Sequence, residues 1–274
     1  MKQLGTILII VMLCLSCQKD DHQIENLNGN KISILGHGGM GINSAYPINT
    51  LESIIRSLNS GADGVEIDVQ MTKDSILVAY HNRNLSAETD MEGEIFSKTW
   101  KEIQDARYTT SPYLDYKIAS LNSIFNSIKN KNDYLFALDV KVPYHHKEIE
   151  KYSLTLARAL KQLINDQNIN SRVIIESPDT GFINLLIKEN VNAKLAFYLR
   201  DFDLACQFAE DNSLYGIVTS DDHINKEQVS NAHQKNIRVI LFNVDDKEDN
   251  REAIRLNPDI IQTDKLKHLV KLLK

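Results

Sequence analysis

Short runs of apolar and β-branched residues alternate with longer amphipathic segments from Lys31 to the end of the chain, at nearly regular spacing. This alternation is typical of a parallel sheet whose strands are joined by crossover helices. A closed barrel of this kind has eight strands, one fewer than the sequence offers. The nine runs that we predict as strands are Ile32–Gly36, Gly64–Met71, Ile76–His81, Tyr134–Val140, Arg172–Glu176, Lys194–Leu199, Gly216–Thr219, Arg238–Val244 and Asp259–Thr263.

The connection between the second and third runs accounts for the extra strand. Only the segment Thr72–Ser75 separates them, whereas a crossover between parallel strands needs a dozen or more residues. These two runs must therefore form an antiparallel hairpin. The remaining eight units, closed by a last helix over Lys265–Leu273, predict a (β/α)8 TIM barrel.

A long irregular insert follows the predicted hairpin. It spans Asn82–Ile118, includes Trp100 and Tyr113, and is followed by a predicted helix over Leu121–Lys129. Loops that follow barrel strands form the active-site face in this architecture. We therefore expect the insert to take part in substrate recognition.

The N-terminus has the features of an export signal. Its apolar stretch, Leu4–Leu15, is too short to span a bilayer, and Ser16-Cys17 resembles the lipobox of bacterial lipoproteins. We expect residues 1–17 to be a signal peptide with its lipidation site at Cys17, the alternative being simple cleavage of a secretory signal. Residues 18–30 are polar and aperiodic, which predicts a tether. Residues 31–274 then form one barrel domain of an exported, lipid-anchored protein at the outer membrane or cell surface.

The charge distribution limits the partners. The formal net charge is −6, and lysines and arginines are scattered without a basic run. This pattern gives no electrostatic footprint for a nucleic acid and no polybasic membrane patch. We expect contact with a membrane through the lipid anchor only, while the sequence leaves the oligomeric state open.

Two carboxylates occupy alternate positions of an otherwise apolar strand, at Glu66 and Asp68. A two-residue turn at Lys73-Asp74 would place His81 directly opposite Glu66, so that all three side chains share one face. Buried like charges need a cation between them, and oxygen ligands without cysteine favour Mg²⁺ or Ca²⁺ over zinc. Taken alone, the pair is equally consistent with a solvent-facing acidic row.

The neighbouring strands add further polar groups. Asp139 and Lys141 alternate at the end of the third barrel strand, an arrangement suited to a metal and an anionic oxygen. His37 follows the first strand and is next to two glycines. Opposed to His81 across a metal, it is a candidate acid or base, because imidazole titrates near neutrality.

These residues carry a resemblance to a known family. The segments His37-Gly-Gly, Pro47-Ile-Asn-Thr50, Gly61 to Asp74, His81-Asn82 and Asp139-Val-Lys141 resemble motifs of the glycerophosphodiester phosphodiesterases, which have a TIM barrel of the PLC-like phosphodiesterase type. The later segments Glu88–Gly93, Ala119–Leu121, Ile175–Ser177, Phe242–Asp245 and Ile260–Asp264 fall where that family has further motifs. The resemblance extends from about Ile32 to the end of the chain.

The resemblance implies a role for each matching residue. Glu66, Asp68 and Asp139 would hold the divalent metal, and His37 and His81 would act as base and acid, with the two roles open to exchange. Lys141, Asn49 and Phe242 would contact the substrate. The implied reaction is hydrolysis of a small phosphodiester to glycerol 3-phosphate and an alcohol.

The chain also departs from the family pattern. Gly38 replaces an arginine that usually binds phosphate, Ile48 replaces a glutamate, and Asn82 replaces an aspartate. Asp139 stands where a glutamate is usual, and Phe242 where a tryptophan is common. These departures keep two other hypotheses open: a barrel phospholipase, of the C or D type, acting on phospholipids or lysophospholipids, and a surface lipoprotein that binds phosphodiesters with little or no turnover.

Overall fold

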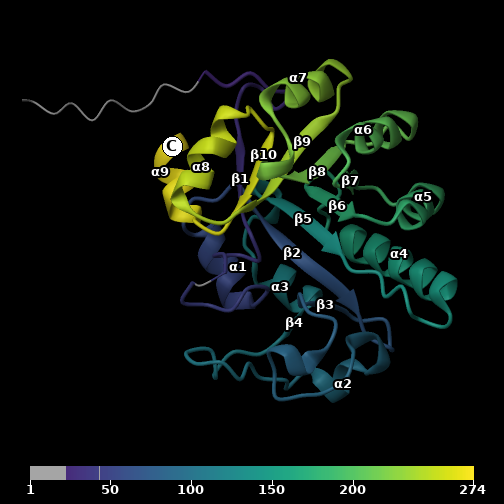
Figure 1. The fold of residues 1–274 in the computed structure, drawn as a ribbon. Helices are drawn as coiled ribbons and strands as arrows, with labels where there is room; N and C mark the ends of the chain where they lie inside the picture. The colour runs from purple at the N-terminus through teal and green to yellow at the C-terminus, as the bar shows by residue number, and fades with distance from the viewer. Residues whose placement is uncertain (1–22, 43) are drawn as a thin grey trace, which may run out of the picture.

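The computed structural model describes residues 23–42 and 44–274 (Figure 1). The predicted signal peptide and Cys17 lie outside the described residues. In the described chain, eight parallel strands form a closed barrel, because β1 pairs with both β10 and β2. These strands are β1 (Ser33–Gly36), β2 (Gly64–Met71), β5 (Leu135–Val140), β6 (Val173–Ser177), β7 (Lys194–Tyr198), β8 (Gly216–Ser220), β9 (Arg238–Val244) and β10 (Ile260–Thr263). The predicted TIM barrel is confirmed.

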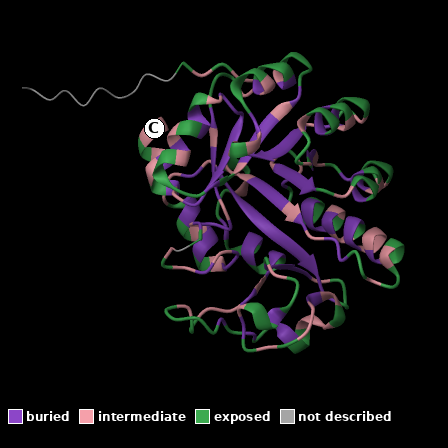
Figure 2. Ribbon diagram, in the orientation of Figure 1, coloured by how far each residue is buried: buried purple, intermediate pink, exposed green. Residues whose placement is uncertain are grey.

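Helices surround the barrel and keep their polar faces in solvent (Figure 2). Several begin at a residue whose side chain accepts a hydrogen bond from a free backbone N–H of the first turn, such as Thr50, Asp179 and Asp201. The helices are α1 (Leu51–Leu58), α3 (Leu121–Ser127), α4 (Ile149–Asp166), α5 (Thr180–Lys188), α6 (Phe202–Asp211), α7 (Lys226–Gln234), α8 (Lys247–Arg255) and α9 (Leu266–Leu273).

The apolar side chains form two layers. The larger layer lies between the strands and the helices, and its members from the strands include Ile67, Leu138 and Ile175. A smaller cluster fills the barrel interior with one residue from each of seven strands: Leu35, Ala137, Ile174, Ala196, Val218, Ile240 and Ile260. Because strand side chains alternate, residues two positions after each member of this cluster lie on the same interior face. They are also nearer the carboxyl ends of the strands, so polar residues at these positions gather at that end of the barrel.

The hairpin is present, but its predicted register is wrong. In β2 and β3 (Leu77–Ala79), Val69 pairs with Ala79 and Met71 with Leu77. Ser75 adopts a positive φ of 67° and adds a third residue to the predicted two-residue turn. His81 consequently does not pair with Glu66: it lies beyond the end of β3, and it is Tyr80 whose N–H donates to the carbonyl of Asp68 at 3.1 Å.

The insert forms a small unit of its own beside the barrel. It contains α2 (Trp100–Ile103), and the two-residue strand β4 (Ala119–Ser120), absent from our prediction, extends the hairpin. The insert's apolar side chains pack against those of β3 in a separate cluster of Val78, Tyr80, Leu85, Ile95, Ile103, Ala106, Tyr108 and Ile118. The insert is therefore held by a core distinct from the barrel's.

The N-terminal segment is bound at the amino-terminal ends of the barrel strands, at the end of the barrel away from the insert (Figure 1). The Asn26 amide donates to the Pro258 carbonyl at 2.7 Å, and the Asn28 amide donates to Ser33 Oγ at 2.7 Å. Ile24 packs against the main core. Part of the predicted tether over residues 18–30 therefore contacts the folded domain, through Ile24, Asn26 and Asn28.

In residues 23–42 and 44–274, none of the helices has both the length and the apolar character needed to cross a membrane.

Candidate active site

Three carboxylates converge at the carboxyl ends of β2 and β5. One oxygen each from Glu66, Asp68 and Asp139 lies within 4.8 Å of the others. Glu66 and Asp68 are buried, while Asp139 is half-buried. Oxygens that bind one Ca²⁺ or Mg²⁺ each lie about 2.0–2.6 Å from the ion, so this spacing fits a shared cation. The residues present therefore suit the predicted metal site.

The electrostatics of the cluster also favour a cation. Burial and the charge of Asp68 raise the pKa of Glu66 well above its usual value, and burial raises that of Asp139. Burial alone would raise the pKa of Asp68 as well, but the positive charge of Lys141 outweighs it and lowers the pKa. The cluster thus has more negative charge than the nearby protein groups neutralise.

Lys141 and Asn49 act on the cluster directly. The Lys141 ammonium lies 2.9 Å from Asp68 and also contacts Asp139. The Asn49 amide donates to Asp68 Oδ2 at 2.7 Å, and its oxygen accepts from the Asp68 N–H at 2.9 Å. Asn49 is fully buried and positions Asp68, while its predicted substrate contact stays a prediction. A phosphate contact by Lys141 stays a prediction.

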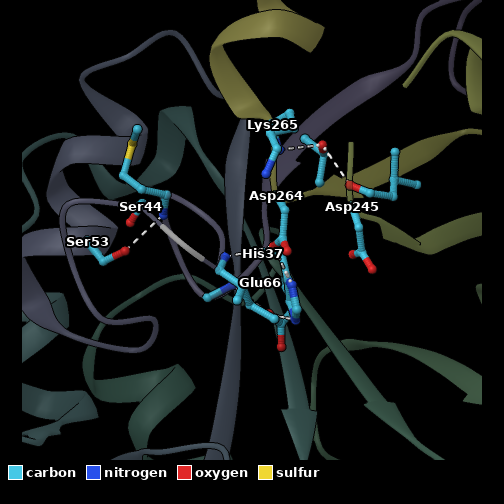
Figure 3. A network of polar contacts seen from close by, with 12 residues as sticks. His37, Ser44, Ser53, Glu66, Asp245, Asp264 and Lys265 are labelled. Atoms are coloured by element: carbon cyan, nitrogen blue, oxygen red, sulfur yellow. Dashed lines mark hydrogen bonds and ion pairs between the residues drawn. The ribbon is translucent and has the colours of Figure 1, made fainter. Parts of the chain in front are cut away.

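His37 lies between two carboxylates (Figure 3). Its Nδ1 is 2.8 Å from Asp264 Oδ1, and its Nε2 is 4.0 Å from Glu66 Oε2. Burial alone would lower the pKa of His37, but the bond to Asp264 and the charges of Glu66, Asp264 and Asp68 raise it to about 9. Asp264 fixes which ring nitrogen carries the proton and leaves Nε2 facing the carboxylate cluster.

A tight turn after β1 holds this arrangement together. The Gly38 N–H donates to Glu66 Oε2 at 2.9 Å, and Gly38 has a positive φ of 52°. A Cβ at this position would overlap the side chain of Ile48. The two departures from the family pattern, Gly38 and Ile48, are therefore in contact, and no side chain fits at residue 38 without a backbone shift.

His81 approaches the same site from the insert side. It is exposed and, with His37, lines a cavity of about 310 Å³ between the 42–48 loop and the insert. Its charge lowers the pKa of Asp68 and Glu88, so it lies close to both carboxylates. The structure thus brings the two predicted histidines together, although by a different hairpin register.

Phe242 lies at the mouth of the barrel, in edge-on contact with Tyr198 at 5.2 Å between ring centroids. It packs on the interior cluster, which is consistent with the predicted hydrophobic wall.

Two site residues were missing from our predicted set. Asp264 orients His37, and Glu176 lies buried inside the barrel, where it accepts a hydrogen bond from Gln262 at 2.8 Å. Burial raises the pKa of Glu176 to about 8. One sequence pattern could have identified Asp264. Gln262 and Asp264 occupy alternate positions at the carboxyl end of the last strand, as Glu66 and Asp68 do in β2.

Comparisons with known proteins agree with this geometry. The chain is 27% identical over 235 residues to the glycerophosphodiester phosphodiesterase of Bacillus altitudinis, covering 82% of this chain and 91% of that protein. Two solved structures share the fold. A glycerophosphodiester phosphodiesterase from Parabacteroides distasonis has a TM-score of 0.75 and 20% identity, over 89% of this chain and 97% of the other.

An Oleispira antarctica phosphodiesterase, solved in complex with the product sn-glycerol-3-phosphate, also has a TM-score of 0.75, with 18% identity over 88% of this chain and 96% of the other. The model of the glycerophosphoryl diester phosphodiesterase family matches residues 40–268. The chain therefore belongs to the glycerophosphoryl diester phosphodiesterase family and is a phosphodiesterase.

Proposed function

We propose that this chain hydrolyses soluble glycerophosphodiesters to glycerol 3-phosphate and an alcohol, with a divalent cation held by Glu66, Asp68 and Asp139. The observation that carries the proposal is His37, which is fixed by Asp264 with its second nitrogen directed at a three-carboxylate cluster. The Oleispira antarctica relative, solved with sn-glycerol-3-phosphate, supports the product.

The cation is Mg²⁺ or Ca²⁺, because its ligands are oxygens alone. When bound, it supplies Lewis acidity, which lowers the pKa of the attacking hydroxyl or water and neutralises developing charge on the phosphate. Lys141, 2.9 Å from Asp68, stands beside the same position and adds positive charge toward a non-bridging phosphate oxygen.

The two histidines move the protons. His37 accepts the proton of the nucleophile at Nε2, while Asp264 accepts a hydrogen bond from Nδ1–H and stabilises the imidazolium that forms. His81, which lines the same cavity as His37, donates a proton to the departing alcohol. The exchanged assignment, with His81 as the base and His37 as the acid, stays open.

We further propose that Cys17 is lipidated; the position of the N-terminal segment would then favour soluble diesters over the phospholipase alternative. Asn26 and Asn28 bind at the amino-terminal ends of the barrel strands, near Pro258 and Ser33, whereas the site lies at the carboxyl ends. The seven residues from Cys17 to Ile24 span at most about 25 Å. An anchor there turns the site away from the membrane and toward soluble diesters.

The test measures the alcohol released from glycerophosphodiesters in Mg²⁺, in Ca²⁺ and in EDTA. We expect EDTA to abolish release, and Glu66→Gln to lower kcat/KM by roughly 100-fold or more because it removes a ligand charge. Glu150→Gln, an exposed carboxyl in α4, is the matched control and should leave the rate unchanged.

The same assay on phospholipid and lysophospholipid vesicles separates the alternatives. Faster cleavage of vesicle lipids than of soluble diesters would favour the phospholipase. Metal-dependent binding of a glycerophosphodiester in calorimetry without any product would favour a surface lipoprotein that binds without turnover. Release that is indifferent to both EDTA and Glu66→Gln would overturn the proposed metal site.

A further inference from the structure

We propose that the amino-terminal end of the barrel is a second anion site, which binds a phosphate group. Three basic side chains form it, Arg172, Lys194 and Arg238, together with the ring of Tyr215. The site lies at the end of the barrel away from the carboxylate cluster, and none of its residues belongs to the proposed metal-binding or catalytic set. The inference is therefore independent of the proposed function.

Strand alternation brings the three cations together. Arg172 comes just before β6, while Lys194 and Arg238 begin β7 and β9. Each of the three lies two positions before a member of the interior cluster. Because strand side chains alternate, all three face the barrel interior at its amino-terminal end. They are far apart in the sequence, so no basic run indicates the site.

Between β7 and β9, the strand β8 adds no side chain at the corresponding interior position, because Gly216 stands there. The preceding residue, Tyr215, packs its ring on the interior cluster. The Lys194 Nζ lies 4.8 Å from the centre of this ring, and the Arg238 guanidinium carbon lies 4.6 Å from the same centre. A ring face attracts cations but has no net charge, so both positive charges remain uncompensated.

The described chain supplies no acidic partner for these cations. Arg172, Lys194 and Arg238 are half-buried, and in residues 23–42 and 44–274 none of them forms an ion pair with a carboxylate. Lysine and arginine are seldom buried without a partner. Burial and the charges of Arg238 and Arg172 lower the pKa of Lys194, so the three like charges lie close enough to repel one another. A bound anion would replace this repulsion by attraction.

One carboxylate near the site is committed elsewhere. The charge of Asp259 acts on Tyr215, but Asp259 is fully buried, and its Oδ2 binds His233 at 2.9 Å and a backbone N–H of β9 at 2.8 Å. Arg238 donates one hydrogen bond, to the Leu27 carbonyl at 3.2 Å. This bond holds the guanidinium in place and leaves its other N–H groups for a ligand.

A phosphate group suits this set of donors. Guanidinium groups match pairs of phosphate oxygens, and an ammonium adds a point charge. The oxygens of a phosphate point in several directions, so donors from three strands can reach one group at the same time. The N-terminal segment that leads toward Cys17 is bound at the same end of the barrel. Two sources share this chemistry: a phosphate ion in solution and the headgroup of an anionic lipid.

The experiment follows the backbone amides of the full chain by NMR in EDTA, which keeps divalent cations, and phosphate with them, away from the carboxylate cluster. Sodium phosphate and dihexanoyl phosphatidylglycerol below its micelle concentration are added separately, against sodium chloride of equal ionic strength. We expect the amides of Lys194, Tyr215 and Gly216 to shift with a phosphate group and not with chloride.

Charge removal gives the matched comparison. Lys194→Gln should weaken the binding of phosphate about tenfold or more, because it removes one charged donor. Lys188→Gln removes the same charge from an exposed position in the last turn of α5, near the same end of the barrel, and should bind phosphate as the wild type does. Both variants should keep the wild-type kcat/KM on a soluble diester.

The melting temperature is a second readout that does not depend on turnover. Without phosphate, Lys194→Gln should not lower it, because the variant removes a charge that two arginines repel. Phosphate should raise the melting temperature of the wild type and of Lys188→Gln more than that of Lys194→Gln. If Lys194→Gln does not fold, Arg172→Gln takes its place in both measurements.

The outcomes separate the two sources and test the site itself. Tighter binding of inorganic phosphate assigns the site to a free ion, and tighter binding of the lipid assigns it to a headgroup. No shift at these amides, an equal shift with chloride, or phosphate binding that Lys194→Gln and Arg172→Gln both leave unchanged would overturn the site. A wild-type protein that cleaves no diester would count against the proposed function alone.

Discussion

The mouth of the barrel and the insert differ in how they hold their functional groups. At the mouth, carboxylates and imidazole come from strand ends, are buried or half-buried, and bind one another through short contacts. The insert has its own small core and is fastened to the 42–48 loop by the hydroxyls of Tyr108 and Tyr113. The groups proposed to carry out the reaction therefore stand on the barrel, and the groups expected to recognise the alcohol stand on the insert.

The two histidines show this difference at single-residue scale. The His37 side chain is 24% exposed and is fixed by Asp264. His81 is exposed, and among the described residues nothing hydrogen-bonds its ring. The proposed base, His37, is therefore held in place before substrate binds, whereas the proposed acid, His81, is not.

The largest expected effect tests the groups at the mouth of the barrel. His37→Asn removes the fixed base and should lower kcat by roughly 10²–10⁴-fold, measured as alcohol release at saturating substrate. His145→Asn removes an exposed imidazole that pairs with Glu94 on the insert, and should stay within a factor of about two of wild type. A loss below tenfold for His37→Asn would show that the mouth does not contain the base.

Most of the fold could be predicted from the sequence because it depends on long, repeated signals. Strand runs and connection lengths identified nine strands, and the short Thr72–Ser75 connection forced a hairpin. The predicted register was wrong because the register depends on one backbone angle. Ser75 adopts a left-handed conformation, which the side-chain pattern of the sequence does not indicate. The short strand β4 was missed because its two residues carry no periodicity.

The site residues differ in the same way: some follow from a repeated sequence pattern, and others depend on single contacts in the folded chain. Glu66, Asp68 and Asp139 were predictable because alternation along paired strands places their side chains on one face. The contact of Asn49 with Asp68 was not predicted, because it depends on two hydrogen bonds formed across a loop. Asp264 was missed as a site residue because its contact with His37 depends on barrel closure, which joins the last strand to the first.

The second prediction concerns how firmly the base is fixed. Asp264→Asn removes the charge that holds His37 and should lower kcat by roughly 10–100-fold. Because the Asp264 hydrogen bond raises the pKa of His37, the acidic limb of the pH profile of kcat should also move to lower pH. An unmoved limb would mean that Asp264 acts only on packing.

The third prediction uses pH and metal removal on the folded protein. The pKa of His37 is raised to about 9 and that of Glu176 to about 8. A raised folded pKa contributes stability that is present at low pH and lost as pH rises through that value. In EDTA, the melting temperature should therefore fall between about pH 6 and pH 9. The corresponding loss in the free energy of unfolding is roughly 1–3 kcal/mol.

Two comparisons sharpen this result. Glu176→Gln keeps the partner of Gln262 but cannot ionise, so it should flatten the part of the fall near pH 8. Saturating Mg²⁺ or Ca²⁺ favours the ionised carboxylates and should reverse the slope. A metal-free protein whose melting temperature rises from pH 6 to pH 9 would contradict the raised pKa values.

The smallest expected effect tests the attachment of the insert. Tyr113→Phe removes the 2.6 Å hydrogen bond to the Ser44 carbonyl at a cost of about 1 kcal/mol, but keeps the ring in the cavity. Because the reaction groups stand on the barrel, kcat should change little while KM rises about two- to fivefold. Tyr198→Phe, which removes the hydroxyl of an exposed tyrosine on another part of the mouth, is the control. If Tyr113→Phe instead lowers kcat and leaves KM unchanged, the insert helps to orient the reacting groups, and the separation between a rigid chemical half and an attached recognition half fails.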